Sequence, residues 1–99
     1  MSVEQIIMNH NKLGDDGAAA IASVLPQLPP TLATLGLQAN FIGPQGCAAL
    51  ATGLKRIAQR PDDATLAVYV SFNNFGSEGA RCLKLAEEEC KPWLKVVFS

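Results

Sequence analysis

The sequence predicts an α/β protein built from a repeated strand–helix unit. Three stretches align without gaps: NHNKLGDDGAAAI from Asn9, QANFIGPQGCAAL from Gln38 and SFNNFGSEGARCL from Ser71. Apolar residues at alternate positions precede each stretch, as in a half-buried strand. Apolar residues three or four positions apart follow, as in an amphipathic helix. The 99 residues form at most one domain.

The three copies share an asparagine, two glycines and two apolar positions. The aligned asparagines, Asn11, Asn40 and Asn73, are separated by 29 and 33 residues. A final strand pattern, with Trp93, Val96 and Phe98, starts a fourth copy. We therefore predict one domain over residues 1–99, with repeats at about 3–31, 32–64 and 65–92 and a partial repeat at 93–99.

Each unit contains one predicted strand and one predicted helix. In the second unit, Leu35 and Leu37 alternate with polar or small residues, which predicts one buried and one exposed strand face. The helix after Gly43 carries one apolar stripe of Cys47, Leu50, Leu54 and Ile57. Pro44 suits its first turn, where a missing N–H costs nothing. Such units cannot bury their apolar faces alone, so they must stack.

The motif N-x-[LIF]-G-x-x-G-A and the period near 29 residues resemble those of leucine-rich repeat proteins of the ribonuclease-inhibitor-like subtype. The resemblance covers about three and a quarter repeats. It implies an α/β fold, a short segment of a right-handed β–α horseshoe solenoid. A parallel sheet would line its concave side, and helices would cover its convex side.

The turn between strand and helix contains the shared asparagines and glycines. Asn11, Asn40 and Asn73 are expected to bridge backbone groups of successive turns, because an amide offers two donors and one acceptor. In the family, these asparagines form a buried ladder. Gly14, Gly43 and Gly76 are expected to hold a backbone conformation that is costly for other residues.

The first copy, NHNKLGDDG, resembles a metal loop when it is considered alone. The helix dipole already explains carboxylates such as Asp15 and Asp16 in a first helical turn, and we expect both on the surface. His10 is the only histidine, and the glycine turns lack the lysine of a phosphate-binding loop. We predict no catalytic residue, no metal, no cofactor and no enzymatic activity.

Composition excludes several classes of protein. Hydrophobic residues make up 48% of the chain, charged residues 17%, and the net charge is −1. This balance indicates a globular chain and provides no strong field for nucleic acid or a membrane surface. Three cysteines, Cys47, Cys82 and Cys90, cannot all pair within the chain and are expected to be buried thiols. They favour an intracellular, cytoplasmic location.

The variable strand positions predict where a protein partner binds. One row across the concave face contains Ile7, Gly36, Tyr69 and Val97, with Phe72 beside it. Aromatic side chains beside small residues are typical anchors for a protein partner. Scattered exposed apolar residues are also ordinary. The predicted partner-binding residues are Ile7, His10, Gln38, Tyr69, Phe72 and Val97. The predicted function is a non-catalytic protein–protein interaction module or scaffold.

The two ends of the predicted solenoid suggest an alternative function. No polar capping unit is visible, so both edge strands are expected to be open to pairing with other chains. Glu87 occupies the position of Leu25 and Leu54, which predicts a wetter third helix. The alternatives are a subunit of a self-associating or larger assembly, or a fragment of a larger leucine-rich repeat regulator. Such a regulator would be of the GTPase-activating or innate-immune receptor type.

Overall fold

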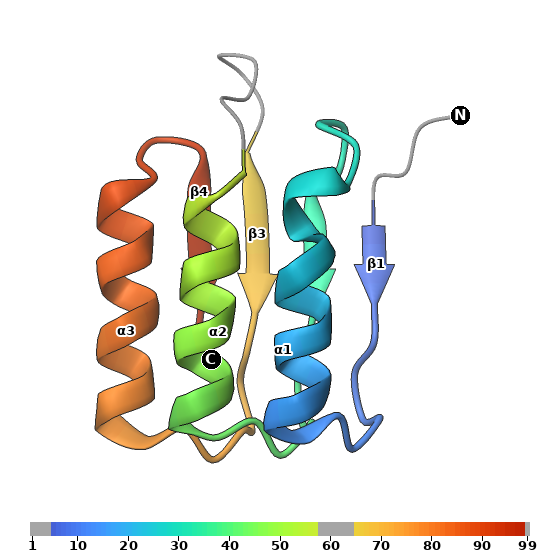
Figure 1. Ribbon diagram of the computed structural model, residues 1–99, viewed down its shortest axis with the longest axis vertical. Helices are drawn as coiled ribbons and strands as arrows, with labels where there is room; N and C mark the ends of the chain where they lie inside the picture. The colour runs from blue at the N-terminus through green and yellow to red at the C-terminus, as the bar shows by residue number, and fades with distance from the viewer. Residues whose placement is uncertain (1–4, 58–64, 99) are drawn as a thin grey trace.

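Strands and helices alternate along the chain in the computed structural model, which describes residues 5–57 and 65–98. The order is β1 (Gln5–Ile7), α1 (Gly14–Val24), the 3-10 helix η1 (Leu25–Gln27), β2 (Thr34–Gly36), α2 (Pro44–Lys55), β3 (Leu66–Tyr69), α3 (Gly76–Glu89) and β4 (Leu94–Val97). The expected strand–helix unit is thus present three times, followed by a fourth strand (Figure 1). The repeat boundary predicted at residue 64 lies outside the described residues.

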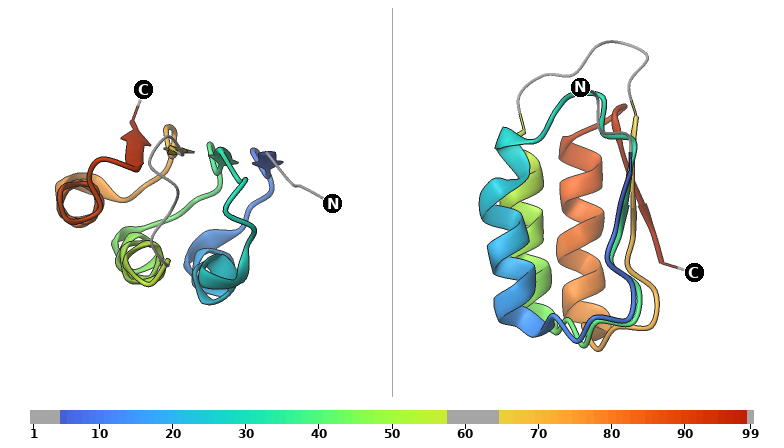
Figure 2. Two further views of the ribbon diagram at one scale, coloured as in Figure 1. Left: turned by 90° about the horizontal axis from the view of Figure 1, so that it is seen from above. Right: turned by 90° about the vertical axis from the view of Figure 1, so that its right-hand side faces the viewer.

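The four strands form one parallel sheet in the order β1-β2-β3-β4. The register places Ile6, Leu35, Val68 and Val96 in one row. The three α-helices lie side by side on one face of this sheet, and no helix of the described residues lies on the opposite face (Figure 2). The predicted fold class is confirmed: parallel strands alternate with helices, as in a short solenoid.

The core lies between the sheet and the helices. The strands contribute Leu35, Leu66 and Val68, each at most 1% exposed, and α2 contributes Leu50 and Leu54. Neighbouring helices contact through small side chains, including Ala18, Ala22, Cys47 and Ala51. α2 ends at Lys55, so Ile57, predicted to be on the helical stripe, packs against the core from the segment after the helix. Because the side chains on the facing surfaces are small, the helices can approach one another closely.

Two asparagines connect successive turns between strand and helix. The side-chain oxygen of Asn40 accepts from the N–H of Asn11 at 2.7 Å, and its amide nitrogen donates to the carbonyls of Met8 and Gln38. The side-chain oxygen of Asn73 contacts the preceding turn in the same way, because it accepts from the N–H groups of Asn40 and Ile42. Asn40 is fully buried, whereas Asn11 is exposed, because no turn precedes it among the described residues. The buried asparagine satisfies backbone groups that the strand ladder no longer pairs.

The glycines of the turn have different roles. Gly14 and Gly76 have φ near +60°, the left-handed region that favours glycine. The expectation for Gly43 is wrong, because its φ of −97° is accessible to any residue. Gly46 is needed for space instead: an added Cβ would lie 2.7 Å from the Asp15 carboxylate and 3.1 Å from Cβ of Ala18. The absence of a side chain at Gly46 therefore lets α2 pack closely against α1.

Asp15 is not free at the surface, contrary to its predicted place. One carboxylate oxygen accepts from the N–H of Gly43 at 2.6 Å and from the N–H of Gly46 at 3.0 Å. Both donors belong to the N-terminal end of α2, where backbone N–H groups have no partner inside the helix. Asp15 therefore caps the neighbouring helix rather than its own, which alignment within one repeat does not reveal. Asp16 is exposed.

The three cysteines are unpaired and differ in exposure. Cys47 and Cys90 are buried, as expected, whereas Cys82 is half-buried. Burial raises the pKa of the Cys47 thiol to about 12, and burial also raises the pKa of Cys90. A raised pKa leaves little thiolate at neutral or mildly basic pH, and the thiolate is the form that reacts.

We expect iodoacetamide at pH 8 to alkylate Cys82 in the folded protein well before Cys47 or Cys90. Mass spectrometry of timed samples would measure the order. In urea all three thiols should react at similar rates, because unfolding removes the burial that protects two of them. A Cys82→Ser variant should lose the fast phase. Fast alkylation of Cys47 in the folded chain would contradict the prediction.

Candidate protein-interaction surface

The face of the sheet opposite the helices carries a row of four residues, here called the open-face row: Ile7, Gly36, Tyr69 and Val97. The strand register pairs each with its neighbour across the sheet. Ile7 is 54% exposed, and Tyr69 and Val97 are half-buried. Gly36 has no side chain, and the Ile7 side chain lies over it. A Cβ added at Gly36 would be 3.1 Å from the terminal carbon of Ile7. The row is an apolar strip across all four strands.

Polar side chains border this row where the strands end. The amide nitrogen of Gln38 donates to the Ser71 hydroxyl at 2.7 Å. The side-chain oxygen of Asn9 accepts from the backbone N–H of Gln38 at 2.8 Å. The predicted binding residue Gln38 is therefore held between two neighbouring strands. Its carbonyl oxygen also receives the N–H of His10, which extends the backbone ladder past β1.

His10 and Phe72 lie in the turns that follow the strands, and their predicted position on the strand face is wrong. Both have left-handed backbones, with φ of 63° and 60°, and the aligned Ala39 has φ of 56°. The chain must turn there from the sheet toward the helix layer. Phe72 is 84% exposed, the highest value among the exposed large hydrophobic residues of the described chain. His10 is also exposed.

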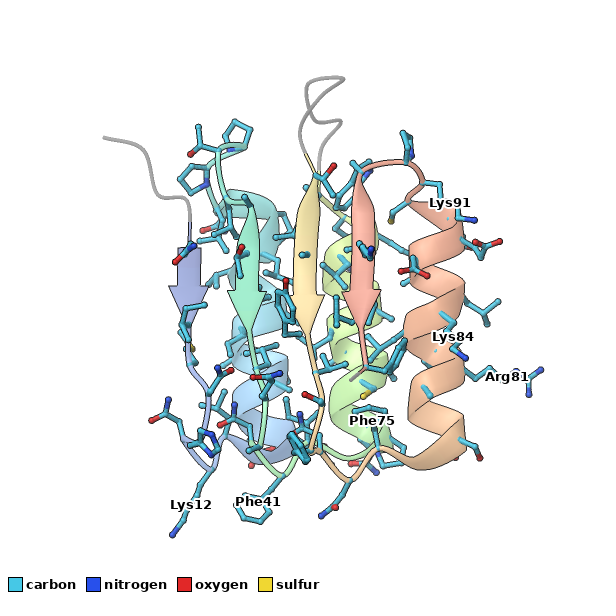
Figure 3. The ribbon with its side chains drawn as sticks, turned by 180° about the vertical axis from the view of Figure 1, so that it is seen from behind. Lys12, Phe41, Phe75, Arg81, Lys84 and Lys91 are labelled. Atoms are coloured by element: carbon cyan, nitrogen blue, oxygen red, sulfur yellow. The ribbon has the colours of Figure 1, made fainter. Side chains whose placement is uncertain are left out.

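Phe41 is a second exposed aromatic residue at the same edge, and the sequence interpretation missed it. Its side chain is 60% exposed and its φ is 59°. Figure 3 shows Phe41 and Lys12 extending from the edge of the sheet where the turns lie. The repeat alignment contained the signal, since Phe41 aligns with the polar residues Lys12 and Asn74. We call Phe41 and Phe72 the turn-edge aromatics.

The β4 edge is closed, contrary to the expectation of two open edges. The Glu87 carboxylate accepts from the N–H of Val96 at 2.7 Å. The N–H groups of Leu66, at the start of β3, and of Val70, just after β3, donate to the carbonyls of Trp93 and Val97. Val96 is in register with Val68, which lies between these two donors, so its N–H is directed away from β3. An added strand would need this donor. Glu87 therefore closes the edge, which explains an acidic residue at a position of leucine in the other helices.

Aromatic and cationic side chains complete the closure below β4. The rings of Phe75 and Phe98 meet edge to face at 5.9 Å between centroids. The Lys84 ammonium lies 5.6 Å from the Phe98 ring centroid. At the positions aligned with Lys84, the other helices carry Ala22 and Ala51, which are buried beneath the next helix. This end of the molecule thus differs from the internal repeats in both layers.

The described residues do not bring together a set of groups for metal binding. No cluster of three or more His, Cys, Asp or Glu side chains that could hold a metal ion occurs within residues 5–57 and 65–98. Over the same ranges, no helix is both long and apolar enough to cross a bilayer. Ile7, Phe41 and Phe72 are exposed large hydrophobic residues of the open-face row and the turn-edge aromatics, and Val24 and Leu85 are exposed on the helices. The open-face row and the turn-edge aromatics together expose apolar side chains of the kind found where macromolecules meet.

The fold and this surface define a β–α repeat solenoid with an uncovered sheet face. The family described as Leucine Rich repeat matches residues 1–22 and 66–84, segments that include β1 with most of α1 and β3 with most of α3. These matches support a leucine-rich repeat protein, a family that generally mediates protein–protein interaction and is typically non-catalytic. Comparisons with curated proteins and with solved structures each found no match.

Proposed function

We propose that this chain is a non-catalytic protein-interaction module that binds a protein partner through the open-face row and the turn-edge aromatics. Phe72 carries the proposal. Its position requires a left-handed backbone, which is costly for a bulky residue, and its ring is 84% exposed. His10 and Ala39 show that smaller or polar residues fit the same turn. The fold therefore does not require a phenylalanine there, and the exposed ring supports a role in binding.

The open-face row adds area next to Phe72. Tyr69, three residues earlier, offers a rigid ring with a polar end, a combination enriched at the centres of protein interfaces. Ile7 and Val97 extend the apolar surface to the outer strands. Gln38, held by its hydrogen bond to the buried Ser71, supplies a polar group already in place, so ordering it on binding costs little. We propose that the partner is a folded protein contacting several strands at once.

The ribonuclease-inhibitor-like subtype and a cytoplasmic location form part of the proposal. Turn spacings of 29 and 33 residues and the glycine pattern support the subtype. Three cysteines that form no disulfide support a reducing compartment. A scaffold role fits the same features.

We expect the double variant Tyr69→Ala with Phe72→Ala to bind the native partner at least about 30-fold more weakly, since two interface anchors are removed. The measurement is the amount of partner recovered with the tagged full chain from its native source, followed by titration of the purified pair. Thr52→Ala is the matched control, because Thr52 is exposed on α2, away from the sheet face. Unchanged partner recovery by the double variant would contradict the proposal.

Self-association through the β1 edge is a second candidate function. β4 is closed by Glu87, whereas the outer side of β1 pairs with no strand among the described residues. Beside that edge, Val24 is exposed on α1 at the position where α2 and α3 carry Gly53 and Ala86 against the preceding helix. A second copy contacting β1 and α1 would extend both layers.

If the second candidate holds, sedimentation equilibrium of the pure chain should show a monomer–dimer equilibrium, and Val24→Asp should shift it at least tenfold toward monomer. The expected shift corresponds to about 1.4 kcal/mol for placing a charge in an apolar contact. Leu85→Asp, on the outer face of α3, is the control with the same change in charge. A monomer that persists to millimolar concentration would exclude this candidate.

A further inference from the structure

The outer face of α3 carries a groove. The contacts between α1 and α2 and between α2 and α3 show how a helix packs on the equivalent face of the other repeats. The groove has a volume of about 340 Å³ and is lined by Ser77, Ala80, Arg81, Lys84, Leu85 and Glu88. In the repeat alignment, Ala80 corresponds to Cys47 of α2, which lies buried beneath α3. The α3 face is therefore the one that a further helix would cover, and no helix of the described residues does so.

The groove has an apolar floor between charged side chains. Leu85 is 57% exposed, whereas the aligned residue of α2 is the polar Thr52. Figure 3 shows Arg81 pointing outward from α3. Lys84 turns toward the Phe98 ring, which leaves its ammonium at the border of the groove. An exposed leucine beside two cations is suited to an amphipathic ligand.

The charge of the groove selects the sign of that ligand. Glu88, the acidic residue of the lining, forms an ion pair with Lys91 at 2.5 Å and is thereby largely neutralised. Arg81 and Lys84 remain as the unbalanced charges of the lining. The α2–α3 contact shows the same chemistry, because Lys55 of α2 reaches Glu89 of α3 at 3.3 Å. Exposed pairs add little affinity but discriminate against a partner of like charge.

The closed β4 edge determines the shape of the ligand. Because Glu87 takes the Val96 N–H, a complete strand–helix unit cannot continue the sheet without displacing that carboxylate. The helix layer has no such closure. We infer that the outer face of α3 docks an acidic amphipathic helix of a partner protein. Its apolar stripe would lie on Ala80 and Leu85, and its carboxylates would lie opposite Arg81 and Lys84.

The test uses three synthetic peptides and the intact chain. The first is an amphipathic helix as long as α3, with a Leu/Ala stripe and glutamates on its polar face. The second replaces every glutamate with lysine, and the third is an acidic Thr/Val peptide that favours a strand. Titration of the ¹⁵N-labelled protein, followed by amide chemical shifts, gives both the dissociation constant and the location of binding.

We expect the acidic helix to bind with shifts concentrated on α3 and the lysine helix to bind at least tenfold more weakly. Binding should weaken as salt is raised, because the selecting charges are exposed. Arg81→Glu should abolish the preference, and Leu85→Asp should weaken binding of the acidic helix at least tenfold. Lys12→Glu is the matched charge-reversal control and should change neither. The Phe98 ring contacts described above involve Phe75 and Lys84, so the Arg81 variant leaves them intact.

Four outcomes would overturn the inference. They are equal binding of both helical peptides, shifts centred on the open-face row, no saturable binding of the acidic helix at millimolar concentration, and preferential binding of the strand peptide at β4. The double variant Tyr69→Ala with Phe72→Ala should bind the acidic helix as the wild type does. A failure of the inference about α3 can therefore be distinguished from a failure of the proposed function of the open-face row and the turn-edge aromatics.

Discussion

Replacing Asn40 with alanine should lower the free energy of unfolding by about 3 kcal/mol. The side chain makes three hydrogen bonds in a fully buried position: it accepts from Asn11 and donates to Met8 and Gln38. Alanine removes all three hydrogen bonds and leaves the Asn11 N–H without its partner, whereas the Gln38 carbonyl keeps the N–H of His10. Each buried backbone group left unsatisfied costs about 1–3 kcal/mol.

The measurement is thermal unfolding followed by circular dichroism, with urea unfolding as a check. For a domain of this size, the expected loss corresponds to a decrease in Tm of about 10–20 °C. Asn11→Ala is the control, since Asn11 makes side-chain bonds to Met8 and Asn9 but is exposed. Water can replace those bonds, so its cost should stay below about 1 kcal/mol. Equal losses for the two variants would contradict the buried role of Asn40.

Replacing Gly53 with valine should destabilise the protein by about 3 kcal/mol through overlap between two helices. A Cβ at this position would lie 2.5 Å from the backbone carbonyl oxygen of Ala22 and 3.0 Å from its Cα. Because the overlapping atoms of α1 belong to its backbone, a change of side-chain rotamer cannot relieve the overlap. The two helices α1 and α2 must therefore move apart. Overpacked cores lose about 1–3 kcal/mol, and a rigid backbone partner places this variant at the upper end.

Helix propensity acts in the opposite direction, which makes the sign of this prediction informative. Glycine is less favourable inside a helix than valine by a few tenths of a kcal/mol, so an isolated helix would gain from the change. Ala48→Val, on the exposed face of the same helix, is the control and should cost at most about 0.7 kcal/mol. Urea denaturation curves compare the two variants. A Gly53→Val protein as stable as the wild type would show that α1 and α2 do not approach this closely.

The repeat made the architecture predictable. A strand period of two and a helical period of 3.6, each recurring in register, determine which residues face inward, and stacking of such units leaves one arrangement. Leu35, Val68 and Val96 accordingly form one buried row of the sheet. The open-face row was predictable for the same reason, because alternation assigns Ile7, Tyr69 and Val97 to the opposite face.

The turn edge was only partly predictable. Phe72 was recognised as exposed, yet it was placed on a strand, because periodicity does not report where the backbone changes to the left-handed region. Phe41 was missed because its apolar neighbours suggest burial, and only comparison with Lys12 and Asn74 across the repeats indicates an exposed position. Gly43 shows the reverse error, in which an aligned glycine was assigned a conformation that its own turn does not adopt.

Spacing along the chain sets the repeated strand–helix unit, its inward faces and the apolar row across the sheet, so the sequence alone predicts them. Contacts between the folded units set which side chains act on a neighbouring unit. Asp15 caps the following helix, and Glu87 closes the β4 edge. Both contacts join residues that periodicity treats separately. A carboxylate's partner is set by distance in three dimensions, which a pattern within one repeat does not contain.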